Sequence, residues 1–350
     1  MDRTQRLRGL MLGTAVGDAL GLPAEGLSRQ RIRKWYGGTW RHRFCFGWGM
    51  VSDDTDHTVF VAQSLLAHPD SVERFTSRLG WCLRGWVASL PAGIGVATLR
   101  ATLKLWIGFP PSRSGVFSAG NGPAMRSAPI GAFFAENPEL RTTFVTASTR
   151  LTHTDPKAVI GARAVADIAA WVVRENLVSR PSKEDFLALL HQVGTDADWQ
   201  ELLQKLSTAI DQELSVETFA DRLGLSRGVS GYMFHTVPVA LYAWYRHFGD
   251  FEATLKSVLD LGGDTDTVAA ITGALAGTVV GESGIPLPWR TGIWDWPRGR
   301  RILETIADRL AAPGPSAVPI RYFWPALPAR NLVFLLIVLG HGFRRLAPPY

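Results

Sequence analysis

Apolar residues recur along most of the chain at intervals of three or four positions, which is the spacing of helices with one buried face. No stretch alternates apolar and polar residues convincingly enough to indicate a strand. Clusters of glycine, proline and serine separate the helical stretches. We therefore predict an all-α protein in which residues 26–50 and 108–131 are loops. Helices are expected over residues 4–21, 53–67, 71–90, 93–107, 139–151, 156–176, 183–194, 197–212, 216–224, 229–247, 250–260 and 298–311, and over the apolar run that ends at Val280.

Two of these helices carry glycine at every fourth position. The glycines are Gly13, Gly17 and Gly21 in the first, and Gly273, Gly277 and Gly281 in the second. Each glycine inside a helix costs about 1 kcal/mol relative to alanine, so a stripe of them needs a physical reason. Close contact with another backbone is such a reason, because glycine has no side chain to prevent it. We predict that the two helices cross at short distance and bring Asp18 and Glu25 towards Asp264 and Asp266.

Two acidic clusters stand directly before apolar helical runs. The first is Ser52-Asp53-Asp54-Thr55-Asp56, and the second, some two hundred positions later, is Gly262-Gly263-Asp264-Thr265-Asp266-Thr267. Asp, Ser and Thr are favoured at helix N-termini, and the helix dipole stabilises negative charge there. One such cluster is ordinarily a cap. Two of them indicate a divalent-metal site if the fold brings them together, and the alternative is two unrelated caps.

The chemistry of these side chains indicates which ion they would hold. Carboxylate and hydroxyl oxygens select hard cations such as Mg²⁺ or Mn²⁺. Four carboxylates around one space repel one another strongly, and two cations about 3.5–4 Å apart would offset that repulsion. The candidate ligands form two sets, Ser52, Asp53 and Asp54 from the first cluster and Asp264, Asp266 and Thr267 from the second. The expected cofactor is therefore a pair of Mg²⁺ or Mn²⁺ ions.

Composition narrows the class of protein further. A chain of 350 residues with 46% hydrophobic and 19% charged residues can form one large domain or two ordinary ones. The formal net charge of +6 suits an anionic ligand or partner, although genome composition could account for it equally. The arginines are scattered, so we expect no sequence-specific binding of nucleic acid. The two cysteines, Cys45 and Cys82, lack a Cys-x-x-Cys spacing, which argues against a disulfide framework or a zinc site.

The two ends of the chain bear on localisation. Residues 3–16 resemble a signal peptide, but Asp18 follows the glycine-rich run at once, so we reject that interpretation. The longest apolar run, Leu332–Leu339, is too short to span a bilayer. We therefore expect a soluble cytoplasmic protein without a membrane partner. Residues 313–350 are predicted to form a Pro-rich connector and an apolar tail segment, which either docks on the body or contacts a membrane surface or another protein.

Five segments, taken in order, carry a resemblance to a known family. They are Gly17-Asp18-Ala19-Leu20-Gly21-Leu22-Pro23-Ala24-Glu25, Ser52-Asp53-Asp54-Thr55, Gly120-Asn121-Gly122-Pro123-Ala124-Met125-Arg126, Thr152-His153-Thr154-Asp155-Pro156 and Gly262-Gly263-Asp264-Thr265-Asp266-Thr267. Together they resemble the ADP-ribosylglycohydrolase family, whose members include dinitrogenase reductase-activating glycohydrolases. The resemblance covers residues 5–285. It implies a single large orthogonal helical bundle, with a catalytic domain over residues 1–312 and two Mg²⁺ or Mn²⁺ ions between the acidic helix mouths.

The resemblance also implies a role for each site residue. Asp53 or Asp54 would orient or deprotonate the attacking water, and Glu25 matches a glutamate that in some members approaches the metals and helps catalysis. The two sets of oxygen-bearing residues above would be the metal ligands. The family usually has threonine where this chain has Ser52, so that ligand would be held less firmly. The residues implied to bind the substrate are Ser118, Gly120, Asn121, Gly122 and His153.

Some residues near these motifs have plainer interpretations. Met125 and Arg126 are expected to pack and to brace their loop. His57 follows the first acidic cluster, and we expect it either to support the metal ligands or to face solvent. His153 could equally have a capping or structural role. The aromatic candidates for stacking on an adenine are Trp48, Phe117 and Tyr232.

The implied function is metal-dependent hydrolysis of the glycosidic bond between ADP-ribose and a modified protein side chain or related adduct. A metal pair would clamp the ribose diol and position the attacking water, and the transition state would resemble an oxocarbenium ion. The expected partner is ADP-ribose or an ADP-ribosylated protein. Two alternatives stay open, namely a metal-dependent nucleotide phosphoester hydrolase and a non-catalytic family member that binds ADP-ribose. The acceptor residue, the anomer and the oligomeric state are not predicted.

Overall fold

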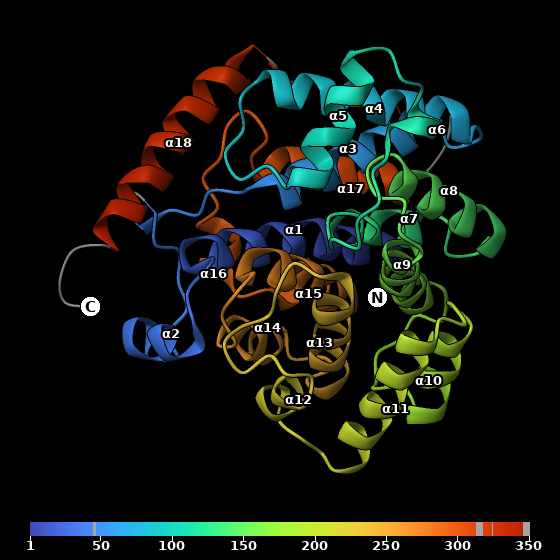
Figure 1. Ribbon diagram of the computed structural model, residues 1–350, viewed down its shortest axis with the longest axis vertical. Coiled ribbons are helices and arrows are strands. Elements are labelled where there is room, and N and C mark those ends of the chain that lie inside the picture. The colour runs from blue at the N-terminus through green and yellow to red at the C-terminus, as the bar shows by residue number, and fades with distance from the viewer. Residues whose placement is uncertain (45–46, 313–317, 324, 346–350) are drawn as a thin grey trace.

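Helices form the regular structure of the chain. The computed structural model describes residues 1–44, 47–312, 318–323 and 325–345 (Figure 1). Within these ranges the only β contacts are isolated bridges, so the all-α prediction is confirmed. The α-helices are α1 (Arg3–Gly21), α2 (Arg29–Tyr36), α3 (Asp53–Ala67), α4 (Val72–Ala88), α5 (Val96–Trp106), α6 (Pro111–Ser114), α7 (Ala128–Phe133), α8 (Pro138–Arg150), α9 (Pro156–Arg174), α10 (Lys183–His191), α11 (Ala197–Asp211), α12 (Val216–Arg222), α13 (Met233–Arg246), α14 (Phe251–Leu259), α15 (Thr265–Val280), α16 (Leu287–Thr291), α17 (Arg300–Ala311) and α18 (Ala326–Arg344). Short 3₁₀ helices are η1 (Leu22–Ala24), η3 (Ala124–Arg126) and η4 (Glu282–Gly284).

Helices α1 and α15 lie against each other at the centre of the molecule and are buried along most of their length (Figure 1). A β-carbon built on Gly13 would lie 2.1 Å from the carbonyl oxygen of Gly273, and one built on Gly277 would lie 2.0 Å from that of Gly9. This pairing makes the two helices antiparallel, and only residues without a side chain permit so close an approach. The predicted crossing is therefore confirmed. Gly281 lies just past the end of α15, where its φ of 68° favours glycine.

The antiparallel packing places the end of α1 beside the start of α15. The hydroxyl of Thr265 donates a hydrogen bond of 2.8 Å to the carbonyl oxygen of Gly21. The turn that follows α1 contains η1 and leads directly to Glu25. In that turn the N–H of Gly26 donates a hydrogen bond of 2.8 Å to the carbonyl oxygen of Gly263. The segment that carries Glu25 is therefore tied to the second acidic cluster.

Asp18 ties the same helix to the first acidic cluster. Its buried carboxylate accepts hydrogen bonds from the backbone N–H groups of Ser52, at 2.9 and 3.0 Å, and of Thr55, at 3.1 Å. These groups belong to the first turn of α3, where N–H groups have no partner within the helix. Asp18 therefore accepts hydrogen bonds from the start of α3, and both acidic clusters are held at the C-terminal end of α1.

Two predicted loops contain short helices. Residues 26–50 include α2, and residues 108–131 include α6, η3 and α7. Their glycine, proline and serine content is a breaker signal, but Pro is tolerated in the first turn of a helix, where α6 and α7 have it. Cys45 and the predicted connector residues 313–317 lie outside the described residues.

Helix α18 runs along one edge of the bundle (Figure 1). It begins at Ala326, five residues before the tail segment expected from Asn331. Among the described residues it is the one helix that is long and apolar enough to cross a membrane, judged by length and composition alone, and 28% of its apolar stretch is buried. The length argument based on Leu332–Leu339 is therefore wrong, because the helix extends well beyond that run.

Candidate metal centre and substrate cleft

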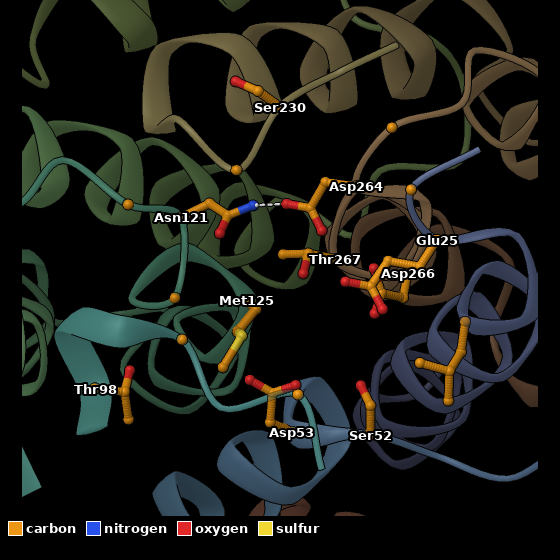
Figure 2. Close-up of a pocket in the computed structure, with 18 of the residues that line it drawn as sticks. Glu25, Ser52, Asp53, Thr98, Asn121, Met125, Ser230, Asp264, Asp266 and Thr267 are labelled. Atoms are coloured by element: carbon orange, nitrogen blue, oxygen red, sulfur yellow. Dashed lines mark hydrogen bonds between the residues drawn. The ribbon is translucent and has the colours of Figure 1, made fainter. Parts of the chain in front are cut away.

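The two acidic clusters meet in space (Figure 2). The hydroxyl of Thr267, in the first turn of α15, donates a hydrogen bond of 3.3 Å to Oδ2 of Asp54, in the first turn of α3. Carboxylate oxygens of Glu25, Asp264 and Asp266 lie within 4.8 Å of one another. Three separate segments of the chain thus contribute oxygen atoms to one centre. The interpretation of the clusters as unrelated helix caps is therefore excluded.

The carboxylates of this centre are buried, and some of their oxygen atoms have no hydrogen-bond donor. Asp54 and Asp266 are 0% and 5% exposed, and in each the Oδ1 atom has no hydrogen-bond partner. Burial raises the pKa of Asp53, Asp54 and Asp266 well above the ordinary aspartate value, and neighbouring carboxylates raise these pKa values further. Buried carboxylate oxygens without donors are costly unless a cation pairs with them. The all-oxygen donor set fits a hard divalent cation.

Asp266→Asn should change how the stability of the metal-free protein depends on pH. Because the pKa of Asp266 is higher in the folded than in the unfolded chain, folding stability is lost as pH rises from about 4 through the raised pKa. The variant lacks this loss. In a chelator, the melting temperature of the variant minus that of the parent should therefore increase as the pH rises from about 4 to about 8. A difference between the two melting temperatures that is the same at every pH would contradict this assignment.

The acidic centre opens into a cleft of about 720 Å³, a volume typical of small-molecule sites. Residues 118–122 form one wall, in the connection between α6 and η3. The side-chain amide of Asn121 donates a hydrogen bond of 2.6 Å to Oδ2 of Asp264 (Figure 2) and one of 3.0 Å to the hydroxyl of Thr236. Asn121 thereby fixes one carboxylate of the centre and leaves its amide oxygen towards the cleft.

His153 supports the same wall from behind. A β-carbon built on Gly120 would lie 3.0 Å from Nε2 of His153, so glycine allows the loop to pack on the ring. The Nδ1 atom of His153 is 2.8 Å from the hydroxyl oxygen of Thr152. Burial, reinforced by the charge of Arg126, lowers the pKa of His153 to about 3. His153 is therefore a neutral lining residue at physiological pH.

Arg126 braces the loop, as predicted from the sequence. Its buried guanidinium donates hydrogen bonds to the carbonyl oxygens of Gly122, at 3.0 Å, and Ser148, at 2.9 Å. His57 lies beside it, fully buried, with Nδ1 at 3.4 Å from the guanidinium and its ring against Trp86. The expectation that His57 could face solvent is therefore wrong, because α3 is buried at every position from Asp54 to Leu66.

The structure brings the candidate site residues together, with one placed differently from the rest. Asp54 does not line the cleft and lies behind it, where its Oδ2 accepts a hydrogen bond of 3.3 Å from the Ser52 hydroxyl. The other candidate residues all line the cleft, and they are Glu25, Ser52, Asp53, Ser118, Gly120, Asn121, Gly122, His153, Asp264, Asp266 and Thr267. Asp53 is therefore better placed than Asp54 to contact a bound substrate, while their chemical roles stay predictions.

Sequence reasoning missed several lining residues. Arg227 and Ser230 lie on the segment between α12 and α13, and Thr98 lies at the start of α5. The run Arg227-Gly228-Val229-Ser230-Gly231 could have been noticed, because glycine and serine beside an arginine suit an anionic ligand. The aromatic residue of the lining is Phe334 in α18, whereas Trp48, Phe117 and Tyr232 are not part of it. Phe334 could not be found by spacing, because it lies in the tail.

Comparisons with known proteins give the same relationship for nearly the whole chain. The family model described as ADP-ribosylglycohydrolase matches residues 1–317. An uncharacterised protein of Archaeoglobus fulgidus is 34% identical over 87% of this chain and 96% of its own length. The ADP-ribosyl-[dinitrogen reductase] glycohydrolase of Rhodospirillum rubrum is 26% identical over 88% of this chain and 97% of its own. A solved structure titled as an ADP-ribosylglycohydrolase-related protein complex is similar with a TM-score of 0.62 and 27% identity, covering 89% of this chain and 97% of that one.

Proposed function

Because the chain belongs to the ADP-ribosylglycohydrolase family of hydrolases, we propose that it cleaves the glycosidic bond between ADP-ribose and a modified protein side chain or a related adduct. The observation that carries this proposal is the meeting of three acid-bearing segments at the floor of one cleft. The family relationship alone would be compatible with a member that has lost its catalytic groups. The intact and converging set of oxygen donors favours an active enzyme.

We propose a pair of Mg²⁺ or Mn²⁺ ions as the cofactor. The buried Oδ1 atoms of Asp54 and Asp266 have no other partner among the described residues, which supports this assignment. Glu25 joins Asp264 and Asp266 in one cluster and is added to the candidate ligands. The residues that would hold the ions are otherwise those expected from the sequence, Ser52, Asp53, Asp54, Asp264, Asp266 and Thr267. Such ions, when bound, would neutralise the clustered carboxylates and would supply positive charge to orient the ribose hydroxyls.

The remaining chemistry falls to side chains at the cleft. Asp53 lines the cleft, and we assign to it the orientation of the attacking water and the acceptance of its proton. The loop of residues 118–122 offers backbone N–H groups and the Asn121 amide to the pyrophosphate and distal ribose. The exposed Arg227 on the segment between α12 and α13 suits the pyrophosphate charge. Positioning of water and substrate in one orientation then supplies much of the rate enhancement.

The test is a panel of substrates assayed with Mg²⁺ or Mn²⁺ and again in excess chelator. ADP-ribosyl-arginine, ADP-ribosyl-serine and O-acetyl-ADP-ribose are the expected classes, and at least one should release ADP-ribose only when the ion is present. Turnover of simple phosphoesters in place of these substrates would favour a phosphoester hydrolase. Tight binding of ADP-ribose without turnover of any substrate would favour a binding protein. Full activity in chelator would contradict the metal assignment.

A further inference from the structure

Helix α18 lies beyond the residues that the family model matches, which end at 317. It nevertheless forms part of the cleft, since Phe334 and Val338 are among its lining residues. Phe334 is 2% exposed and packs in a small apolar cluster with Leu22 and Met50. Leu22 precedes Glu25 and Met50 precedes Ser52, so α18 touches the two segments that lead into the acidic centre.

The first turns of α18 hold the segment that leads into the first acidic cluster. The Arg330 guanidinium donates a hydrogen bond of 2.6 Å to the carbonyl oxygen of Val51 and forms a buried ion pair with Asp295. Asp295 in turn accepts a hydrogen bond of 3.2 Å from the N–H of Val51. The backbone N–H and carbonyl groups of Val51 are thus both held, immediately before Ser52. The backbone that aims Asp53 depends on a residue of the tail.

The last turn of α18 holds the segment that carries Glu25. The Arg345 guanidinium donates hydrogen bonds to the carbonyl oxygens of Glu25, at 2.8 Å, and of Pro23. The Nε2 atom of His341 lies 2.9 Å from the same Pro23 oxygen. The positive charge of Arg345 also partly offsets burial and Asp264, which raise the pKa of Glu25. One side of the Glu25 turn is therefore bound to α18, and the other side is bound to Gly263 through Gly26.

We propose that α18 is a brace of the metal centre, in which Arg330 and Arg345 act as positioning residues for Asp53 and Glu25. The inference rests on the proposed function. A helix is stiff along its length, so contacts at its two ends fix the separation of the two segments that it joins. Oxygen ligands on two such segments bind a cation tightly only when they are held in place before it arrives. The tail outside the family match thereby becomes part of the active site of this chain.

The experiment compares Arg345→Ala with Arg344→Ala in the full-length chain. The two residues are adjacent and carry the same charge, but Arg344 is exposed whereas Arg345 binds the Glu25 turn, so Arg344→Ala controls for loss of charge at the helix end. Binding of Mn²⁺ alone is measured by calorimetry, and exchange of the Gly26 amide hydrogen is measured in chelator. Arg345→Lys keeps the positive charge and a single donor nitrogen, and it tests whether Mn²⁺ binding and amide protection are restored.

Arg345→Ala should weaken Mn²⁺ binding by about 10-fold, which is the lower end of losses seen when groups that orient metal ligands are removed. Its Gly26 amide should exchange faster, Arg345→Lys should recover part of both effects, and Arg344→Ala should match the parent. Equal behaviour of the two alanine variants in both measurements would overturn the brace while leaving the proposed function standing. A parent chain that neither binds Mn²⁺ nor hydrolyses any substrate in the panel would overturn both.

Discussion

Asp266→Asn should lower kcat/KM on an ADP-ribosylated substrate by about 100-fold or more, within the range lost when one group that stabilises charge in a transition state is removed. The physical reason is that Asp266 lies in one cluster with Glu25 and Asp264 and also interacts electrostatically with Asp54, so loss of its charge weakens the whole oxygen cluster. The measurement is initial rate against Mn²⁺ concentration. We expect part of the lost activity to return at high Mn²⁺, because the amide keeps one oxygen donor.

Asp260→Asn is the matched control for this variant. Asp260 lies at the end of α14, shortly before α15, and its replacement by asparagine makes the same charge change. Its carboxylate accepts a hydrogen bond of 2.7 Å from the Trp40 indole and does not line the cleft. The control should retain the activity of the parent. If Asp266→Asn were as active as Asp260→Asn at every Mn²⁺ concentration, Asp266 would not be a metal ligand.

Gly277→Leu should destabilise the protein by about 3 kcal/mol or more, which is a large part of the 5–15 kcal/mol by which a typical domain is stable. The first atom of any side chain at this position would lie 2.0 Å from the carbonyl oxygen of Gly9, so α1 and α15 would have to separate. Separation would disturb every contact that α1 makes with the two acidic clusters. We therefore expect loss of Mn²⁺ binding together with loss of stability, measured by denaturant unfolding.

Gly85→Leu provides the comparison, because Gly85 also lies inside a helix, α4, but a β-carbon there would meet no atom within 4 Å. Replacing a helical glycine at an open position removes its unfavourable helix propensity, so this variant should be as stable as the parent or more stable by up to about 1 kcal/mol. Equal unfolding free energies for the two leucine variants would show that the glycine stripe is not needed for the crossing of α1 and α15.

The sequence predicted the fold class and both acidic clusters of the candidate site because the relevant signals are local. Helical periodicity extends over single segments, and the bounds of α3 agree with the prediction to the residue. Each acidic cluster is a helix start, whose residue preferences act within one turn. The four-residue spacing of glycines within α1 and within α15 is also local. It correctly indicated that each helix packs closely on another, because an unpacked row of glycines would only weaken its own helix.

Tertiary structure alone decided which of these groups face one another. Asp53 and Asp54 are neighbours in sequence, yet the helical twist of α3 turns Asp53 to the cleft and Asp54 to the interior. Arg227 and Phe334 line the cleft because the segment between α12 and α13 and helix α18, both distant in sequence, lie beside the acidic centre. The sequence determined which residues carry oxygen donors suited to a cation and that each acidic cluster stands at the start of a helix. The packing of α1 on α15 and the hydrogen bonds of Asp18 to the start of α3 decided which oxygen atoms meet, because contacts between distant segments depend on side-chain shape and burial.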